Sequence, residues 1–443
     1  MANERPPFDV DGEVIAVLER LWRNGHGAYL VGGGVRDALL GLHVSDWDIA
    51  TAARPERILR LFPGSTYENR FGTVLARGME ITTFRRDHRY ADHRRPDSVT
   101  FSEDVYEDLA RRDLTINAIA WGRRGPEAPA RLVDPADGQG DLGAQLVRAV
   151  GDPSRRFDED ALRLLRAVRI AARLDFTIEP VTRAAIAAHA GDVEYVSEER
   201  IGSELRRMLD MDTPSRAFTL MRETGILAVA IPALEALADG DGLASEGGLA
   251  RSLARLDAAA ATPQGDQRLA LSALLGELGP DEARVVLDRL RVSSRTSDAI
   301  CTLIASASAD YAATWTDADV RRYLGGVPPE LLDDLLALRR VRAQVQDEAA
   351  LTLEDELGER VRAQRDADSP LTLSELAIDG RDLRETLGVP ESPAIGMILE
   401  RLLTDVIEDP ALNTRMTLLT RANLILDELV QGGRGGADTP GIG

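Results

Sequence analysis

The stretch YLVGGGVRDALLGLHVSDWDIAT, Tyr29–Thr51, combines three adjacent glycines, an arginine and several aspartates. The apolar residues Ala28–Val31 predict a short strand, and a helix is expected to begin near Val35. Residues 32–34 would form a glycine turn between them. Glycine lets a ligand approach the backbone closely, and the free amides at a helix start favour an anion. Because adjacent glycines are also typical of an ordinary tight turn, the run alone leaves both interpretations open.

The rest of the stretch adds charged groups to this turn. Arg36, close after Gly33, offers a cationic fork for phosphate oxygens. Asp46 and Asp48 are expected on a strand that continues to Ala50, where alternate side chains share a face. Like charges placed together repel unless a cation lies between them. Beside the glycine turn the pair favours bound Mg²⁺, whereas Asp-x-Asp alone is more typical of a solvated strand edge.

Composition excludes several classes of protein. The chain has 443 residues, 44% of them hydrophobic and 29% charged, which is typical of a soluble protein with two to four domains. Its net charge of -21 argues against a surface coated for nucleic acid, although arginine-rich strips at 85–95 and 155–173 can hold an anionic polymer locally. All 53 basic residues are arginine, so a Walker phosphate loop, which needs lysine, is excluded.

Two further observations concern location and redox chemistry. No apolar run approaches the ~20 residues that span a bilayer, and the N-terminus lacks a secretory pattern, so we expect a cytoplasmic protein without a membrane partner. Cys301 is the single cysteine, which leaves neither a disulfide framework nor a cysteine zinc site.

Two motifs follow the opening stretch. The first is RRDLTINA, residues 111–118, in which Arg112 can neutralise phosphate while Asp113 and Asn117 order the loop or meet a ribose hydroxyl. The second is FDEDALR, residues 157–163, which is expected on a helix. There Asp160, Arg163, Arg166 and Arg169 step by three and begin on one face. Each motif alone is equally typical of a capped or salt-bridged helix.

Taken together, GG-x-VRD-x-LLG and the following D-x-D resemble the nucleotidyltransferase superfamily of DNA polymerase β. More narrowly, the chain resembles class II tRNA nucleotidyltransferases (CCA-adding enzymes) and bacterial poly(A) polymerases. The resemblance implies that two Mg²⁺ ions act at Asp46 and Asp48, and that a nucleoside triphosphate extends an RNA 3′ hydroxyl with release of pyrophosphate. For a CCA-adding enzyme the substrates are CTP, ATP and the tRNA 3′ end, and no obligate protein partner is evident.

The same resemblance assigns roles along the chain. Asp160 and Arg163 are expected to hydrogen-bond the Watson–Crick edge of the incoming base, with Arg166 and Arg169 nearer the triphosphate. Glu80, on a strand before a flexible loop at 80–95, is a weaker candidate for a third catalytic acid. Glu199 and Arg200, in an ER-x-x-x-E motif, are expected to brace the base-reading helix.

The fold class expected is an α+β nucleotidyltransferase head with a mixed sheet and helices, followed by an all-α neck, body and tail. The tail would contact the tRNA elbow. The expected boundaries are 1–145 for the catalytic head, 146–210 for the neck with its base-recognition helix, 211–370 for the helical body, 371–432 for the helical tRNA-binding tail and 433–443 for a disordered end.

Two alternatives stay open. Bacterial poly(A) polymerases share these motifs but usually carry a GRRFR-like segment after the D-x-D strand, whereas residues 69–74 of this chain read NRFGTV, as in the tRNA enzymes. A non-catalytic RNA-binding homologue would have lost a metal carboxylate or a phosphate arginine, and all are present. Full CCA addition and addition of the terminal A alone are not separable from the sequence.

Overall fold

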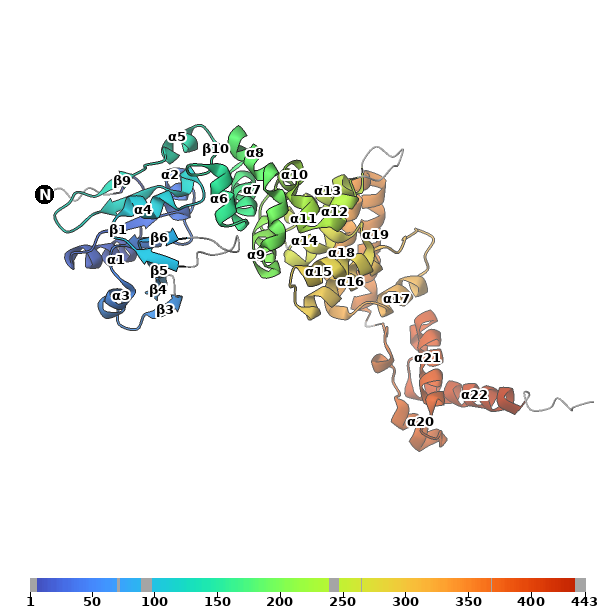
Figure 1. The fold of residues 1–443 in the computed structure, drawn as a ribbon. Helices are drawn as coiled ribbons and strands as arrows, with labels where there is room; N and C mark the ends of the chain where they lie inside the picture. Colours follow the sequence, from blue (N-terminus) through green and yellow to red (C-terminus); the bar gives the residue numbers. More distant parts are fainter. Residues whose placement is uncertain are drawn as a thin grey trace, which may run out of the picture. The chain divides into compact units, whose positions relative to one another are not determined.

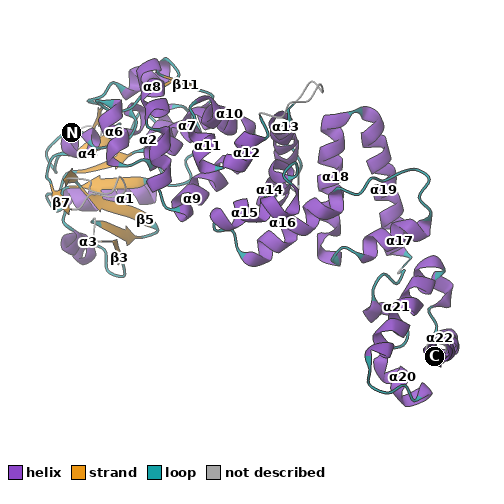
Figure 2. Cartoon of the chain, turned by 45° about the vertical axis from the view of Figure 1, so that its right-hand side comes forward, coloured by secondary structure: helices purple, strands orange, loops and turns teal. Residues whose placement is uncertain are grey.

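The computed structural model describes residues 6–69, 72–88, 98–238, 247–263, 265–367 and 369–434. Contacts divide the chain into two compact units, Met1–Ala261 with Glu282–Ser294 and Thr262–Asp281 with Arg295–Gly443. Strands occur only in the N-terminal part, and every element after β11 (Thr177–Ile178) is helical (Figures 1 and 2). The predicted α+β head followed by helices is therefore confirmed.

A seven-stranded mixed sheet forms the centre of the head, in the order β3-β4-β5-β2-β1-β8-β9. Neighbouring strands are antiparallel except β2 and β5, which run parallel. The strands are β1 (Ala28–Val31), β2 (Asp48–Thr51), β3 (Thr66–Asn69), β4 (Thr73–Ala76), β5 (Met79–Thr83), β8 (Ala120–Arg123) and β9 (Arg131–Val133). Two smaller pairs are the antiparallel β6 (Arg85–His88) and β7 (Ser98–Phe101), and the parallel β10 (Leu146–Val147) and β11.

The register of the central strands joins the two halves of the opening motif. All four residues of β1 are buried, as expected for a strand paired on both sides. Val31, its last residue, lies opposite Asp48, the first residue of β2. The glycine turn that follows Val31 and the acidic segment that precedes β2 therefore meet at one edge of the sheet.

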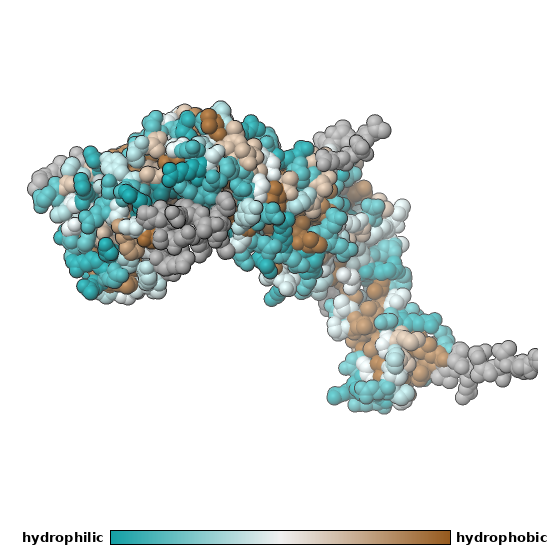
Figure 3. All heavy atoms as spheres, viewed as in Figure 1, coloured by the Kyte–Doolittle hydropathy of each residue, from teal (hydrophilic) through white to brown (hydrophobic). Residues whose placement is uncertain are grey.

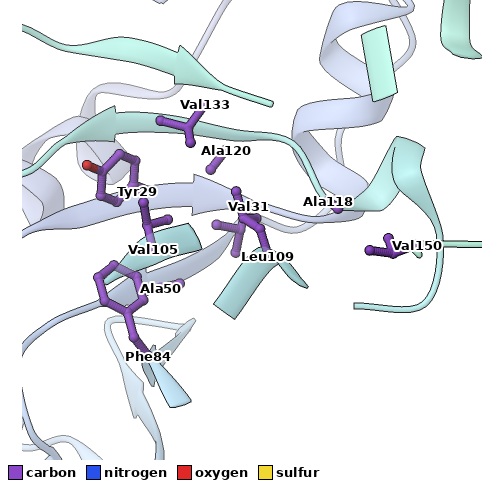
Figure 4. Close-up of a cluster of buried hydrophobic side chains, with 10 residues drawn as sticks. All are labelled: Tyr29, Val31, Ala50, Phe84, Val105, Leu109, Ala118, Ala120, Val133 and Val150. Atoms are coloured by element: carbon purple, nitrogen blue, oxygen red, sulfur yellow. The ribbon is translucent and has the colours of Figure 1, made fainter. Parts of the chain in front are cut away.

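Each face of the sheet packs against helices. On one face Tyr29, Val31, Ala50 and Phe84 join Val105 and Leu109 of helix α4 (Val105–Ala110) in one buried apolar cluster (Figure 4). On the other side, helix α1 (Gly12–Arg23) buries an apolar stripe, and its Trp22 donates through Nε1 to the Ala28 carbonyl at 3.0 Å.

Two details of the opening stretch differ from prediction. Helix α2 (Gly33–Leu39) begins at Gly33, not near Val35, so the turn is the single residue Gly32, whose φ is 79°. Asp46 and Trp47 precede β2 instead of lying on it. Sequence periodicity missed both because Gly33 and Gly34 have low helix propensity yet accept helical angles readily. The predicted strand at Ala28–Val31 is confirmed, and helix α3 (Pro55–Leu61) follows β2.

The first unit also contains the one-turn η1 (Thr115–Asn117) and the short α5 (Gly138–Gly143), and its remaining elements come after these in the chain. They are α6 (Pro153–Glu159), α7 (Leu162–Leu174), α8 (Pro180–Ala188), η2 (Ala190–Tyr195), α9 (Glu198–Leu209), α10 (Ser215–Glu223), α11 (Ile226–Ala230), α12 (Pro232–Ala236) and α13 (Gly248–Ala260), with α15 (Gly279–Arg289) crossing back from the second unit. Asp160 was predicted on the base-reading helix, but it lies in extended backbone between α6 and α7, with φ -155° and ψ 105°.

The second unit is helical throughout its described residues. Its elements are α14 (Gln267–Leu275), α16 (Ser294–Ala307), α17 (Asp317–Gly325), η3 (Pro329–Leu331), α18 (Leu332–Gln346), α19 (Glu348–Asp366), η4 (Leu373–Glu375), α20 (Gly380–Leu387), α21 (Pro393–Glu408), η5 (Pro410–Leu412) and α22 (Arg415–Arg434). A separate apolar cluster, which includes Leu383, Leu402 and Leu418, holds α20, α21 and α22 together. Apolar side chains also reach the surface over α21 and α22 (Figure 3), where Met397 and Met416 are exposed.

Several predictions fall outside the described residues. These are the arginine cluster at 94–96 in the predicted flexible loop, positions 70 and 71 of the NRFGTV segment, and residues 435–443 of the predicted disordered end. The boundaries of head, neck, body and tail stay predictions, since the two compact units are a coarser division. In the described part of the chain, no helix combines the length and the apolar character needed to cross a membrane.

The glycines of α2 provide a test of local packing. A Cβ on Gly34 would meet the Asp46 carbonyl oxygen at 3.0 Å and Trp47 at 3.1 Å, whereas one on Gly33 would meet only Arg36, at 3.5 Å. Alanine adds up to about 1 kcal/mol of helix propensity at either position, while overpacking costs about 1–3 kcal/mol. We expect Gly34→Ala to melt at a lower temperature than Gly33→Ala. Equal melting temperatures would contradict the close approach of the acidic segment to α2.

Candidate active site

A cavity of about 650 Å³ opens in the first unit, between the glycine turn, the acidic segment and α7. It brings together every predicted site residue except Glu80. Those that line it are Gly33, Arg36, Asp46, Asp48, Arg112, Asp113, Asn117, Asp160, Arg163, Arg166 and Arg169. Glu80 lies on β5, exposed and outside this lining, so its catalytic role stays a prediction.

The glycine turn lies directly against charged side chains. A Cβ on Gly32 would lie 3.0 Å from Arg112 Nη1 and 3.4 Å from Asp48 Oδ2. A side chain there would therefore press on a carboxylate and an arginine of the cavity at once, in addition to the strain of a positive φ. The turn is thus needed both for its backbone angle and for the space that it leaves.

Asp46 and Asp48 form the acidic side of the cavity. Ser45 donates from Oγ to Asp46 Oδ2 at 3.0 Å, which fixes one carboxylate. Desolvation raises the pKa of Asp48, and the Asp46 carboxylate raises it further, while Arg112 acts in the opposite direction. Asp48 is nevertheless accessible from the cavity, and a carboxylate whose charge is disfavoured by its surroundings and by a like charge beside it is suited to a divalent cation, because oxygen ligands are those that Mg²⁺ prefers.

Arg36 is buried behind the glycine turn. Its Nε donates to Asp37 at 2.8 Å and its Nη1 donates to Asn117 Oδ1 at 2.7 Å. These bonds connect α2 to the RRDLTINA loop. Contact between Arg36 and a phosphate stays a prediction, since its guanidinium already has two protein partners.

Asp113 connects this loop to α7. Its Oδ2 accepts from Arg166 Nε at 2.7 Å, and its Oδ1 accepts from the Leu114 amide at 2.9 Å and from Asn117 at 3.2 Å. Burial alone raises the pKa of a carboxyl, but Arg166 and Arg163 outweigh it and hold the pKa of Asp113 far below its usual range. Asp113 is therefore ionised. Its hydrogen bonds order the RRDLTINA loop, which is one of the two roles that the sequence analysis offered for it.

The predicted base-reading residues are each held by another side chain. Arg163 donates from Nη1 to Glu159 at 2.7 Å and from Nη2 to the Arg111 carbonyl at 3.1 Å. Asp160 accepts from Arg200 at 2.7 Å. The expectation that Arg200 braces this region agrees with that contact, whereas Glu199 lies largely exposed, 3.9 Å from Arg291.

Three further arginines of the cavity, Arg169, Arg173 and Arg207, also have carboxylate partners. Glu204, buried in α9, accepts from Arg169 at 2.5 Å and from Arg207 at 3.1 Å. Asp37 accepts from Arg173 at 2.9 Å. Glu204 lies outside the lining and Asp37 lies within it, and both fix the positions of guanidinium groups that face the cavity.

Sequence reasoning missed several residues of this site, among them the acid Asp108. Asp108, fully buried in α4, accepts from Arg111 Nη2 at 2.6 Å and from Arg112 Nη2 at 3.2 Å. Burial raises the pKa of a carboxyl, but Arg111 and Arg112 outweigh it and keep the pKa of Asp108 below its usual value. The spacing of three and four residues between this acid and the two arginines was the available signal.

Among the described residues, one group of three could also hold a metal ion, namely Asp158, His189 and Asp192. It does not line the cavity. Both carboxylates approach the same atom, His189 Nδ1, at 3.5 and 2.8 Å. Hydrogen bonding therefore accounts for this group.

A mixed sheet that presents paired carboxylates at one edge of an arginine-lined cavity defines a nucleotidyltransferase. Comparison with known families agrees. Residues 28–148 match the poly(A) polymerase head domain, residues 175–237 match a probable RNA- and SrmB-binding site of polymerase A, and residues 264–422 match the putative domain 2 of tRNA nucleotidyltransferases.

Comparison with individual relatives identifies the family within the nucleotidyltransferases. The CCA-adding enzyme of Geobacillus thermodenitrificans is 34% identical over 93% of this chain and 95% of its own. The crystal structure of the Bacillus stearothermophilus CCA-adding enzyme in complex with CTP matches with a TM-score of 0.72 and 29% identity, over 97% of this chain and all of the other. The Thermotoga maritima enzyme complexed with tRNA shares the fold at a TM-score of 0.61 and 21% identity, over 95% of this chain and 96% of its own. The chain belongs to the family of CCA-adding enzymes and is a tRNA nucleotidyltransferase.

The Asp108 network gives a prediction. Asp108→Asn keeps the shape of the side chain but removes the charge that holds Arg111 and Arg112. We expect the KM for nucleoside triphosphate to rise about tenfold, or ~1.4 kcal/mol, because charge-assisted bonds are roughly twice as strong as neutral ones. Asp104→Asn is the control, since Asp104 caps the same helix and asparagine caps equally well. An unchanged KM in folded Asp108→Asn would contradict the positioning role.

Proposed function

We propose that this chain adds CCA, or its terminal A, to the 3′ end of tRNA from CTP and ATP. The observation that carries the proposal is one cavity in which the paired acids, the arginines and the predicted base-reading residues all meet. The relatives are named CCA-adding enzymes over nearly their whole length, and the similar structure that contains CTP supports that substrate.

The reaction follows from the chemistry of the two substrates. The 3′ oxygen of the RNA attacks the α-phosphorus of the nucleotide and loses its proton, a new phosphodiester bond forms, and the bond to the β-phosphate breaks. Pyrophosphate leaves with the electrons of that bond. The attacking and leaving oxygens lie roughly in line, so positioning and charge stabilisation supply most of the catalysis.

Asp46 and Asp48 fit a pair of magnesium ions, because both carboxylates face one cavity and Asp48 lies close enough to Asp46 for its pKa to rise. Mg²⁺ bound there would activate the RNA hydroxyl and neutralise the leaving pyrophosphate. In the same cavity, Arg112, Arg166 and Arg169 would supply fixed positive charge for the triphosphate. Their carboxylate partners hold them in place before any substrate arrives.

Base selection is assigned to Asp160 and Arg163. Cytosine and adenine both present an exocyclic amino donor next to a ring-nitrogen acceptor, so a carboxylate and a guanidinium complement either base. Uracil and guanine place a carbonyl where the amino group should be. A carboxylate can accept more than one hydrogen bond, so Asp160 retains acceptor capacity while Arg200 fixes its orientation.

The tRNA is expected to follow a narrow basic track to this cavity, with the elbow on the helices of 371–432. Since the chain as a whole is strongly acidic, attraction to RNA is confined to that track. Affinity for tRNA should therefore fall steeply as salt concentration rises.

The proposal is tested with purified protein, magnesium and three tRNAs that end before CCA, after the first C and after CC. Each nucleoside triphosphate is supplied in turn and the products are sized at single-nucleotide resolution. Addition of CTP and then ATP, stopping at CCA, is the expected result. Failure with CTP alone would reduce the activity to A addition, and long A tracts on unrelated RNA would replace the proposal by poly(A) polymerase.

The metal carboxylates have a direct test. Asp46→Ala or Asp48→Ala should reduce incorporation by at least about a thousandfold, the scale of a lost transition-state charge interaction, while tRNA binding changes little. Glu56→Ala, an exposed acid on α3, is the control. Substantial incorporation by either aspartate variant would refute the assignment of the metal site.

Arg163→Ala tests the reading of the base. We expect the preference for CTP over UTP to fall about tenfold or more, because one edge donor is lost, while the affinity for the triphosphate changes less. Arg155→Ala is the matched control, since Arg155 also approaches Glu159, at 3.6 Å, but lies outside the cavity. Unchanged discrimination in Arg163→Ala would count against side-chain selection.

A further inference from the structure

A second cavity in the head shares no lining residue with the catalytic one. It has a volume of about 250 Å³, which suits a single ring with a small substituent better than a whole nucleotide. Its apolar wall includes Phe84 and Val105, and polar groups are contributed by Tyr29, Tyr106, Arg124 and Arg131. An apolar wall with a few polar groups is the usual composition of a small-molecule site.

Tyr29 gives this cavity a buried donor. The residue is only 4% exposed, and within the described residues its hydroxyl has no hydrogen-bond partner. Figure 4 shows the hydroxyl pointing away from Val31 and the apolar cluster. The charged groups that act on it include Arg131 and Arg124, both of which line the cavity. The hydroxyl does not belong to the buried polar atoms that lack a partner, so it reaches the open space of the cavity, where a ligand that accepts from it would replace water.

Arg124 and Arg131 supply two further donors. Neither forms an ion pair within the described part of the chain, in contrast to the arginines of the catalytic cavity. The one hydrogen bond of Arg131 is a long contact of 3.5 Å to Tyr106 Oη. Of the two acids in the wall, Asp104 already accepts from the Tyr106 amide, whereas Glu103 adds one carboxylate that the ligand must tolerate.

We propose that this cavity binds a small aromatic carboxylate. The ring would lie against Phe84 and Val105, while the carboxylate would accept from Tyr29 and from the two arginines. Both arginines are exposed to solvent, so a carboxylate would replace water at their guanidinium groups, while the ring would cover the apolar wall that a bare anion leaves uncovered. Because the catalytic cavity is separate, such a ligand should not compete with CTP.

The test uses 4-fluorobenzoate as the probe and fluorine NMR of the whole chain. Saturable binding is expected, unaffected by CTP. Tyr29→Phe, which removes only the hydroxyl, and Arg131→Gln should each weaken binding by about fivefold or more. Arg60→Gln, an exposed arginine on α3, is the control and should bind normally. 4-Fluorobenzyl alcohol, the same ring without a charge, should bind much more weakly.

A second probe distinguishes a simple aromatic acid from an aromatic amino acid. Tighter binding of 4-fluorophenylalanine would show that the acids Glu103 and Asp104 hold an ammonium group, and weaker binding would identify a simple aromatic acid. The proposal is overturned if neither fluorinated acid binds saturably, if CTP displaces the probe, or if Tyr29→Phe and Arg131→Gln bind as tightly as the unmodified chain.

Discussion

The ion pair between Asp113 and Arg166, 2.7 Å between Oδ2 and Nε, joins the loop of the head to helix α7 of the predicted neck. The pair brings the acidic edge of the sheet to the helix that carries the cavity arginines, and Arg163 reinforces it by donating to the Arg111 carbonyl. Together with the pair between Arg173 of α7 and Asp37 of α2, this junction brings the proposed metal carboxylates and the predicted base-reading residues to one cavity. The buried Asp113 carboxylate, which stays ionised, is the acid of the loop on which the junction depends.

The same arrangement explains how a chain with a net charge of -21 holds a polyanionic substrate. The acids of the site are not distributed evenly around the cavity. Asp108 and Glu204 are buried outside the lining and Asp113 is buried within it, and all three orient arginines, whereas Asp46 and Asp48 are exposed to the cavity. In the proposed function, triphosphate would meet guanidinium groups that have already lost their side-chain freedom, which lowers the entropic cost of binding.

The local pattern of the sequence predicted the buried strand Ala28–Val31 and the acid pair, and the family resemblance extended this to the residues that line the cavity. Sequence alone could not predict which acid holds which arginine. Arg173 and Asp37, for example, pair across 136 residues. The periodicity of the sequence shows which side chains share one face of a helix or strand, but it does not show which helices and strands pack against each other. The same periodicity placed Asp160 on a helix, because Asp160 continues the three-residue spacing of Arg163, Arg166 and Arg169. The backbone at Asp160 is nevertheless extended.

The central claim is that Asp113 couples the triphosphate half of the site to its selective half. The most direct measurement compares kcat/KM for CTP, ATP, UTP and GTP in the unmodified chain and in Asp113→Asn. If Arg166 and α7 lose their position, the ratio of CTP to UTP should fall by about tenfold, or ~1.4 kcal/mol. An equal loss for all four nucleotides, with that ratio unchanged, would contradict the coupling and leave Asp113 as a support for the phosphate site alone.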